Sequence, residues 1–195
     1  MLELQLRRRS PLRDDLLSRG SRDGKAGITI TELAGLSLAL ITTRRAMRDA
    51  CIDKLRTSYE LAAPSTAKIV KGNRLSLSWA GPESWLAIAE DWPNLEPDLM
   101  AALGNAASVV DLSDAHVMLR IKGATASALL AKGLSIDLHP RVFKPGDTAI
   151  TLLKHIVIQL WQVDESPNFD LRVPRATIHD VVHWLRSAGR EFGLM

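Results

Sequence analysis

The segment Leu75-Ser76-Leu77-Ser78-Trp79-Ala80-Gly81-Pro82-Glu83-Ser84-Trp85-Leu86-Ala87-Ile88-Ala89 decides the fold class of this chain. Residues 75–79 and 85–89 are predicted to be strands, and the Gly81-Pro82 pair between them marks a turn. Just before them, Lys71-Gly72-Asn73-Arg74 joins residue 75 to another short strand over residues 68–70, which predicts a hairpin. Consecutive strands with short connections indicate antiparallel sheet.

The same kind of pattern continues on both sides of this segment. Residues 28–33 and 36–42 alternate in polarity around Ala34-Gly35, which predicts a further hairpin. Other strands are predicted over residues 108–112, 115–122, 148–153, 155–163 and 169–173, and helices over residues 44–58, 97–104, 124–132 and 177–192. This order predicts an α+β fold made of two ferredoxin-like βα halves with mainly antiparallel sheets, over residues 26–112 and 113–195.

The net charge of the chain lies at its N-terminus. Of the 195 residues, 25 are Lys or Arg and 22 are Asp or Glu, which gives +3. Residues 1–25 hold seven of the bases and four of the acids, so the remaining body, residues 26–195, is neutral. Residues 1–25 lack an apolar period and are predicted to be a basic arm, either a solvated tail or a segment that orders on a partner's acidic surface. A neutral body argues against a nucleic-acid-binding face.

Composition excludes several other classes of protein. No apolar run approaches the roughly 20 residues of a membrane-spanning helix, and the N-terminus lacks the apolar core of a secretory signal. Cys51 is the only cysteine, so neither an intrachain disulfide nor a cysteine-based metal cluster is expected, and a reducing, cytoplasmic setting is predicted. Cys51 lies on the apolar face of a predicted helix, where it is expected to be a core residue.

His179 and His183 have the spacing of the H-E-x-x-H zinc motif. Asp180 stands where that motif has Glu and is one methylene shorter, and no third ligand follows at a suitable spacing. At about 100° per residue, both His side chains fall away from the apolar face of their helix, so they are expected to face water or a partner protein. Phosphate-binding loops, nucleophile elbows and nucleophile–base pairs are also missing from the sequence. No catalytic, cofactor-binding or metal-binding residue is therefore predicted in this chain.

Tryptophan is used unusually often, with five Trp among nine aromatic residues. Trp79, Trp85 and Trp92 flank the Gly81-Pro82 turn. Two interpretations stay open for them: packing in the core, or a contact patch for another protein, since Trp is enriched at binding hot spots.

Several segments carry a family signature in order along the chain. They are Arg9-Ser10-Pro11-Leu12, Trp79-Ala80-Gly81-Pro82-Glu83-Ser84-Trp85-Leu86, Val110-Asp111-Leu112-Ser113-Asp114-Ala115, Gly123-Ala124 with Ala128–Gly133, Asp137-Leu138-His139-Pro140, Phe143-Lys144-Pro145-Gly146, Phe169-Asp170-Leu171-Arg172-Val173-Pro174-Arg175 and Trp184-Leu185. Together they resemble the gamma subunit of heterotetrameric sarcosine oxidase. The second segment matches the W-x-G-P-x-x-W-L signature of that family, and the resemblance covers most of the chain.

This resemblance implies a fold related to the folate-binding aminomethyltransferases, such as the glycine-cleavage T-protein. It implies a complex that oxidatively demethylates sarcosine to glycine and reduces oxygen to hydrogen peroxide, with 5,10-methylenetetrahydrofolate formed when tetrahydrofolate is present. It also implies alpha, beta and delta subunits as partners, with FAD, FMN, NAD and zinc carried by those subunits and no catalytic residue in gamma. The small subunits of N-methylglutamate dehydrogenases and related complexes are similar, and the motifs do not separate them.

Two hypotheses from different classes remain. In the first, the chain is a non-catalytic subunit that stabilises the complex, with Arg7, Arg8, Arg9, Leu12, Trp85, His179 and His183 as candidate partner-binding residues. In the second, the chain is a stand-alone folate-binding or one-carbon-transfer domain, which needs a carboxylate in a central cavity to hold the pteridine. Asp111 is the first candidate for that carboxylate.

Overall fold

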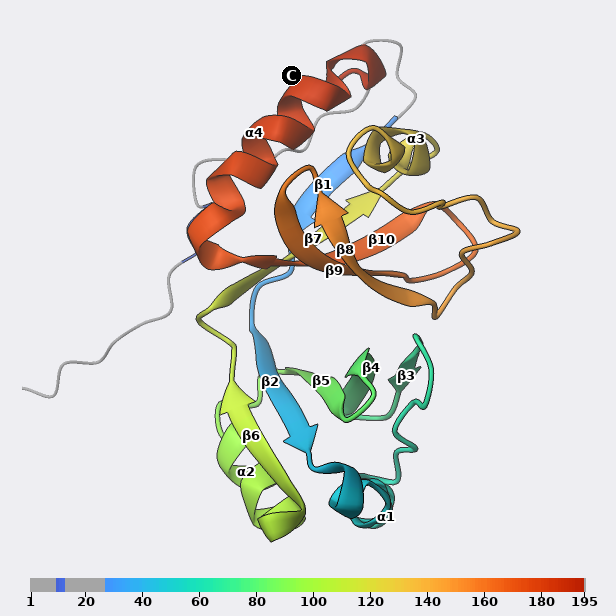
Figure 1. Cartoon of the computed structure of the whole chain (residues 1–195). Coiled ribbons are helices and arrows are strands. Elements are labelled where there is room, and N and C mark those ends of the chain that lie inside the picture. The colour runs from blue at the N-terminus through green and yellow to red at the C-terminus, as the bar shows by residue number, and fades with distance from the viewer. Residues whose placement is uncertain (1–9, 13–26, 195) are drawn as a thin grey trace, which may run out of the picture.

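Two five-stranded antiparallel sheets stack on each other in the computed structural model, which describes residues 10–12 and 27–194 (Figure 1). Sheet A consists, in spatial order, of β1 (Thr29–Glu32), β7 (His116–Lys122), β10 (Asn168–Pro174), β9 (Ile156–Gln162) and β8 (Thr148–Leu153). Sheet B consists of β3 (Ile69–Lys71), β4 (Leu75–Gly81), β5 (Ser84–Glu90), β2 (Leu36–Thr43) and β6 (Ala107–Asp111).

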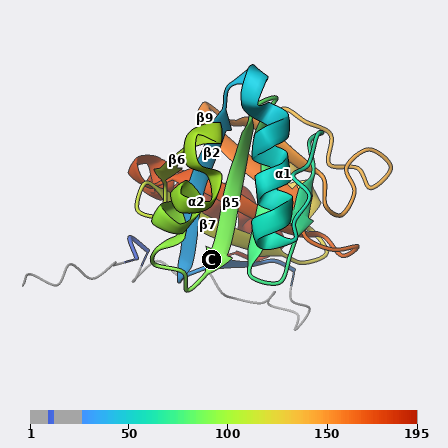
Figure 2. The same ribbon diagram turned by 90° about the horizontal axis from the view of Figure 1, so that it is seen from below.

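The helices cover the face of each sheet that is turned away from the other sheet. α3 (Ala126–Ala131) and α4 (Ile178–Gly189) lie above sheet A in Figure 1, and α1 (Arg48–Tyr59) and α2 (Leu95–Leu103) lie below sheet B. Seen from below, α1 and α2 run in front of β2 and β5 (Figure 2). Four 3₁₀ turns flank these helices, at Arg45–Met47, Gly104–Ala106, Arg175–Thr177 and Arg190–Phe192. None of the helices in the described part of the chain has the length and the apolar composition that a membrane crossing demands.

The two sheets are built on one repeated topology. In sheet B the chain follows the path β2, α1, β3, β4, β5, α2, β6. In sheet A it follows β7, α3, β8, β9, β10, α4, and β1 takes the place next to β7 that β6 takes next to β2. Without the edge strand β3 or β8, each sheet has the ferredoxin-like strand order. The predicted α+β fold of two ferredoxin-like halves with antiparallel sheets is therefore confirmed.

We call residues 36–111 half B, and residues 27–33 with 115–194 half A. β1 belongs to half A although a strand of half B follows it directly. It pairs with β7 from Thr29↔Lys122 to Glu32↔Leu119, whereas β2 pairs with β5 and β6. The predicted hairpin between residues 28–33 and 36–42 is therefore wrong, because Ala34-Gly35 carries the chain from one sheet to the other.

The start of β1 lies beside the end of the C-terminal helix. A Cβ atom placed on Gly27 would lie only 2.9 Å from the carbonyl oxygen of Phe192, so the two backbones are in close contact. In half B, α2 leads into the edge strand β6. In half A, Gly27 just before β1 occupies the corresponding place after α4, although it comes from the other end of the chain. Half A is a circularly permuted version of half B.

Three apolar cores hold the layers together. The core of half A lies between sheet A and its helices, and the core of half B lies between sheet B and its helices. A smaller third core joins the inner faces of the two sheets, with Leu38 and Leu86 from sheet B against Met118 and Trp161 from sheet A. The alternation of each strand decides which side chains enter the third core, since successive residues point to opposite faces.

Candidate functional site

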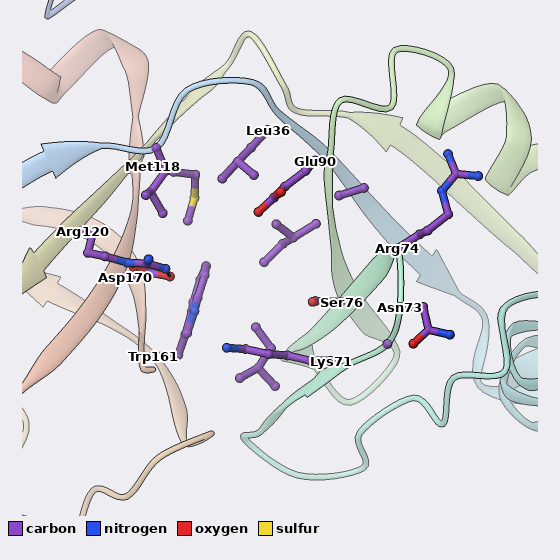
Figure 3. Close-up of a pocket in the computed structure, with 15 residues that line it drawn as sticks. Leu36, Lys71, Asn73, Arg74, Ser76, Glu90, Met118, Arg120, Trp161 and Asp170 are labelled. Atoms are coloured by element: carbon purple, nitrogen blue, oxygen red, sulfur yellow. Dashed lines mark hydrogen bonds and ion pairs between the residues drawn. The ribbon is translucent and has the colours of Figure 1, made fainter. Parts of the chain in front are cut away.

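A cavity of about 380 Å³ opens between the inner faces of the two sheets, beside the third core. Arg120 and Asp170 reach it from β7 and β10, and Trp161 reaches it from β9. Lys71 and Glu90 line it from sheet B, and the side chains of Lys71, Glu90 and Trp161 point into the space between the sheets in Figure 3. With Arg74, which also lines it, the cavity combines an indole face with five charged residues.

Two of these charged groups neutralise each other. Arg120 Nε lies 2.7 Å from Asp170 Oδ1, and Arg120 Nη2 lies 2.8 Å from Asp170 Oδ2, which is the bidentate geometry of a strong ion pair. The hydrogen bond to Asp170 is the main cause of the raised pKa of Arg120. The side chain of Asp170 is only 7% exposed, so its carboxylate is held away from bulk water, whereas the Arg120 side chain is 36% exposed. The pairing engages two of the guanidinium nitrogens and both carboxylate oxygens.

The remaining charged residues of the cavity, Lys71, Arg74 and Glu90, come from the strands of sheet B and the turn between β3 and β4. The guanidinium of Arg74 turns away from the cavity in Figure 3 and stacks on the ring of Trp92 at 4.3 Å. Ser76 is the one hydroxyl group among the described residues that line the cavity, and no His or Cys accompanies it there. Lys71 is paired with Ser76 across β3 and β4, but among the described residues no hydrogen bond joins the Ser76 hydroxyl to this or any other base.

A polar cluster beside the third core links the two halves. Gln159 on β9 is fully buried, and its Nε2 donates to the Ser78 hydroxyl at 3.0 Å and to the Trp79 carbonyl oxygen at 2.9 Å. The Ser78 hydroxyl also lies 3.2 Å from the Thr148 hydroxyl. Because buried polar groups need partners, this cluster fixes how sheet A sits on sheet B.

His179 and His183 lie on the exposed side of α4, as the helical periodicity predicts. The buried positions of that helix are Ile178, Val181, Val182, Leu185 and Gly189. Among the described residues, no group of three or more His, Cys, Asp or Glu side chains is placed to hold a metal ion. The two histidines are exposed, and their role as partner contacts stays a prediction.

Two of the predicted partner-binding residues are buried in this chain instead. Trp85 is 0% exposed in the core of half B, and its Nε1 donates to the Pro64 carbonyl oxygen at 2.8 Å. Leu12 is 3% exposed and packs in the core of half A. Both expectations of direct partner contact are corrected, because neither side chain reaches the surface. Arg7, Arg8 and Arg9 lie outside the described residues.

Cys51 and Asp111 are placed by their surroundings. Cys51 is fully buried, as predicted, and this burial raises the pKa of its thiol.

Asp111 is exposed at the end of β6, where its carboxylate accepts hydrogen bonds from the Ser113 backbone N–H at 2.9 Å and the Ser113 hydroxyl at 2.5 Å. It does not line the cavity between the sheets, so it is not placed to hold a ring there. The turn chemistry of the sequence Asp-x-Ser accounts for it.

The sequence did not single out Arg120, Asp170 and Arg172. All three stand on the inner face of sheet A, with Asp170 opposite Arg120 and Arg172 opposite Met118 across β10 and β7. A charged side chain at every second position of an otherwise apolar strand is the signal that could have revealed them, because that period places them on one face.

The chain is similar to known proteins of one family. Residues 45–191 match the model of the family described as sarcosine oxidase, gamma subunit family. The chain belongs to this family. Its two antiparallel sheets with helices on their outer faces agree with the α+β fold that the sequence resemblance implied.

Curated relatives agree with this family. The chain is 36% identical over 133 residues to the sarcosine oxidase subunit gamma of Corynebacterium sp. (strain P-1), covering 66% of this chain and 64% of that protein. It is 38% identical over 115 residues to the sarcosine oxidase subunit gamma of Arthrobacter sp., covering 58% and 56%. The matches thus span somewhat less than two thirds of the length of these relatives.

Solved structures extend the similarity over most of the fold. A chain of the heterotetrameric sarcosine oxidase from Corynebacterium sp. U-96, in complex with pyrrole 2-carboxylate, matches with a TM-score of 0.78 and 28% identity, covering 88% of this chain and 89% of that one. The glycine cleavage system aminomethyltransferase T from Bartonella henselae matches with a TM-score of 0.60 and 13% identity, covering 85% of this chain and 47% of that one. At that identity the second match shows a shared fold alone.

Proposed function

We propose that this chain is the gamma subunit of a cytoplasmic heterotetrameric sarcosine oxidase and that it stabilises the assembly without taking part in the chemistry. The observation that carries the proposal is the match to a chain of a heterotetrameric sarcosine oxidase over nearly the whole length of both chains. The complex then demethylates sarcosine to glycine with formation of hydrogen peroxide. Its partners are alpha, beta and delta subunits, to which FAD, FMN, NAD and zinc are assigned.

The site geometry supports a supporting role rather than a catalytic one. The strongest charged groups of the cavity, Arg120 and Asp170, are bound to each other in a bidentate pair. Asp111, the carboxylate of the stand-alone folate hypothesis, is engaged with Ser113 outside the cavity.

The proposal is tested by co-expression of this chain, carrying an affinity tag, with the alpha, beta and delta subunits. The tagged chain is expected to retrieve all three with flavin absorbance, and the purified complex is expected to form hydrogen peroxide when sarcosine is added. The isolated chain should show neither flavin absorbance nor sarcosine-dependent peroxide, and titration with tetrahydrofolate should show no tight binding.

Three outcomes would count against this proposal. Peroxide formation by the isolated chain would place chemistry in it, and failure to retrieve a flavoprotein would remove the subunit role. Oxidation of N-methylglutamate but not of sarcosine by the same preparation would keep the subunit role and replace the substrate.

The basic arm and the two exposed histidines are proposed contacts within this complex. Because Leu12 is part of the core of half A, deletion of residues 1–25 would confuse loss of a contact with loss of stability. Replacement of Arg7, Arg8 and Arg9 by Ser keeps Leu12 and removes only charge. This triple variant is expected to co-purify less of the large subunits at 0.15 M salt, where exposed charges within about 8 Å still interact.

A further inference from the structure

Three exposed apolar side chains form a patch at one end of the inner face of sheet A. Ile150 and Leu152 on the edge strand β8 are 43% and 42% exposed, and Val157 on β9 is 57% exposed. Leu152 is paired directly with Val157 across the two strands, and Ile150 is paired with Gln159. Side chains of paired residues share a face of a sheet, so the three lie side by side.

The position of this patch follows from Gln159. That side chain bonds to Ser78 and Trp79 of sheet B, so its face of sheet A is the face that sheet B covers. Val157 is two residues before Gln159 and therefore shares this face. Its high exposure shows that sheet B does not extend over this end of sheet A, which leaves inner-face apolar side chains open to solvent.

A cation that has no partner among the described residues lies on β10, the strand beside β9 of the patch. Arg172 is paired with Gln159 across β10 and β9, so it stands in the same row as Gln159 and Ile150. Its Nε is buried and has no hydrogen-bond partner, and within the described part of the chain no ion pair or hydrogen bond reaches its guanidinium. Burial lowers the pKa of Arg172, as expected for a cation that has lost water and gained no counter-charge.

The described neighbours of this guanidinium offer it no free negative charge. His116 on β7 is close enough for the charge of Arg172, together with burial, to lower the pKa of the imidazole to about 4, so His116 is neutral at pH 7. The nearest carboxylate on β10, that of Asp170, is already held by Arg120. A partly buried charge without a counter-charge is costly, and an incoming carboxylate would remove that cost.

We propose that Ile150, Leu152, Val157 and Arg172 form a docking patch for another subunit of the complex, which presents apolar side chains and a carboxylate that pairs with Arg172. This inference rests on the proposed function, since the partner is a subunit of that complex. The charge of Arg172 indicates what kind of partner surface binds here. An apolar partner surface alone would leave the guanidinium buried and unpaired, whereas an apolar surface with a carboxylate would cover the apolar side chains and pair with Arg172. Apolar contacts around a desolvated ion pair are typical of interface hot spots.

The patch is tested in the co-expressed complex. Two variants remove its features one at a time: Arg172→Gln removes the charge, and the double variant Leu152→Thr with Val157→Thr replaces exposed apolar surface while keeping side chains that favour strands. Val142→Thr is the matched control, because Val142 is 62% exposed in a loop away from the patch. Circular dichroism and thermal unfolding of each isolated chain establish that the variants are folded.

Dissociation of the tagged chain from the large subunits is then measured at 0.05 and 0.3 M salt. Each patch variant is expected to raise the dissociation constant about tenfold or more, and Val142→Thr to leave it unchanged. The salt dependence should be weaker for Arg172→Gln than for the wild-type chain.

The failures of this inference and of the proposed function are distinguishable. If the wild-type chain assembles and both patch variants assemble as tightly, the docking patch is overturned while the subunit role stands. If the isolated wild-type chain dimerises and the patch variants abolish only that dimer, the occupant is a second copy and the proposal is again overturned. If the wild-type chain does not assemble at all, the proposed function itself fails, and the docking patch fails with it.

Discussion

Half A and half B have the same topology but are assembled from the chain in different ways. Half B is continuous, from β2 to β6. Half A takes its last strand from the other end of the chain, with Thr29 paired to Lys122, and its core contains 24 buried residues against 15 in half B among those described. The difference shows that a ferredoxin-like half requires an edge strand at this position of the sheet, but that this strand does not have to follow the rest of the half in the sequence.

The largest effect is expected at the junction between β1 and β7, where half A takes its edge strand from the other end of the chain. Gly123 has φ +138, and a Cβ atom there would lie 2.2 Å from the Gly27 carbonyl oxygen and 2.9 Å from Ile28 Cα. Gly123→Ala is therefore expected to lower the free energy of unfolding by at least about 3 kcal/mol, because both the backbone and β1 must move. Urea unfolding followed by Trp fluorescence measures this change.

Gly146→Ala is the control for the junction. Gly146 also has a positive φ, +82, but a Cβ atom there would lie 3.9 Å from its nearest neighbour, the Ile69 carbonyl oxygen. The cost of this substitution is limited to backbone strain of about 1 to 2 kcal/mol. Equal costs for the two variants would show that β1 is not packed tightly against β7.

The variant Gln159→Leu tests how strongly the two halves are coupled in unfolding. This change keeps the side-chain size and removes the hydrogen bonds to Ser78 and to the Trp79 carbonyl oxygen, which are part of the polar link between the sheets. The expected loss is about 1 to 2 kcal/mol, together with a broader urea transition as the halves unfold less cooperatively.

Gln162→Leu provides the comparison for that link. Gln162 is also buried, but its Nε2 donates to the Asp164 carbonyl oxygen within half A. Its loss should lower stability without broadening the transition. A broad transition for both variants would refute a specific role of Gln159 in joining the halves.

Stability is also expected to depend on pH. His116 stands where the chain returns from half B to half A, and burial, followed by the nearby charge of Arg172, lowers its pKa from 6.5 to about 4. Between these values the unfolded chain binds a proton that the folded chain does not, so stability is full above pH 6.5 and falls as pH drops toward 4.

Substitution of His116 by Gln should flatten that part of the stability profile. His155→Gln serves as the control, because His155 is exposed in the turn between β8 and β9. Thermal unfolding midpoints at pH 4.5 and 7 measure both variants against the wild-type chain. An unchanged pH profile in His116→Gln would mean that another group controls the loss.

The strands, the helices and the fold class could be predicted from the sequence because they depend on local periodicity. The prediction failed at Ala34-Gly35, where two alternating strands with a short connection satisfy the hairpin pattern although they join different sheets. Alternation shows which residues share a face but not which strand lies beside it. The partner of Thr29 is Lys122, and no local pattern connects them.

The candidate site was predicted less completely for the same reason. Helical periodicity placed His179 and His183 on the surface correctly. The Arg120–Asp170 pair joins residues fifty positions apart, and it exists only because β7 and β10 are neighbours. Trp85 is named from the sequence as a candidate partner contact, because Trp is frequent at binding hot spots. That frequency carries no information on burial, and the structure places Trp85 in the core.

The crossing of the chain between the sheets has a consequence for the order of folding. Pairing β1 with β7 closes a loop of about 90 residues, and the chain entropy of a flexible loop of that length costs about 4 kcal/mol. Half B shortens this loop, because its two ends are neighbours: Ala39 is paired with Asp111, and the Leu112 backbone N–H donates to the Leu38 carbonyl oxygen at 2.8 Å. Once half B has folded, β1 and β7 leave it side by side, so prior folding of half B would lower the entropic cost of pairing them.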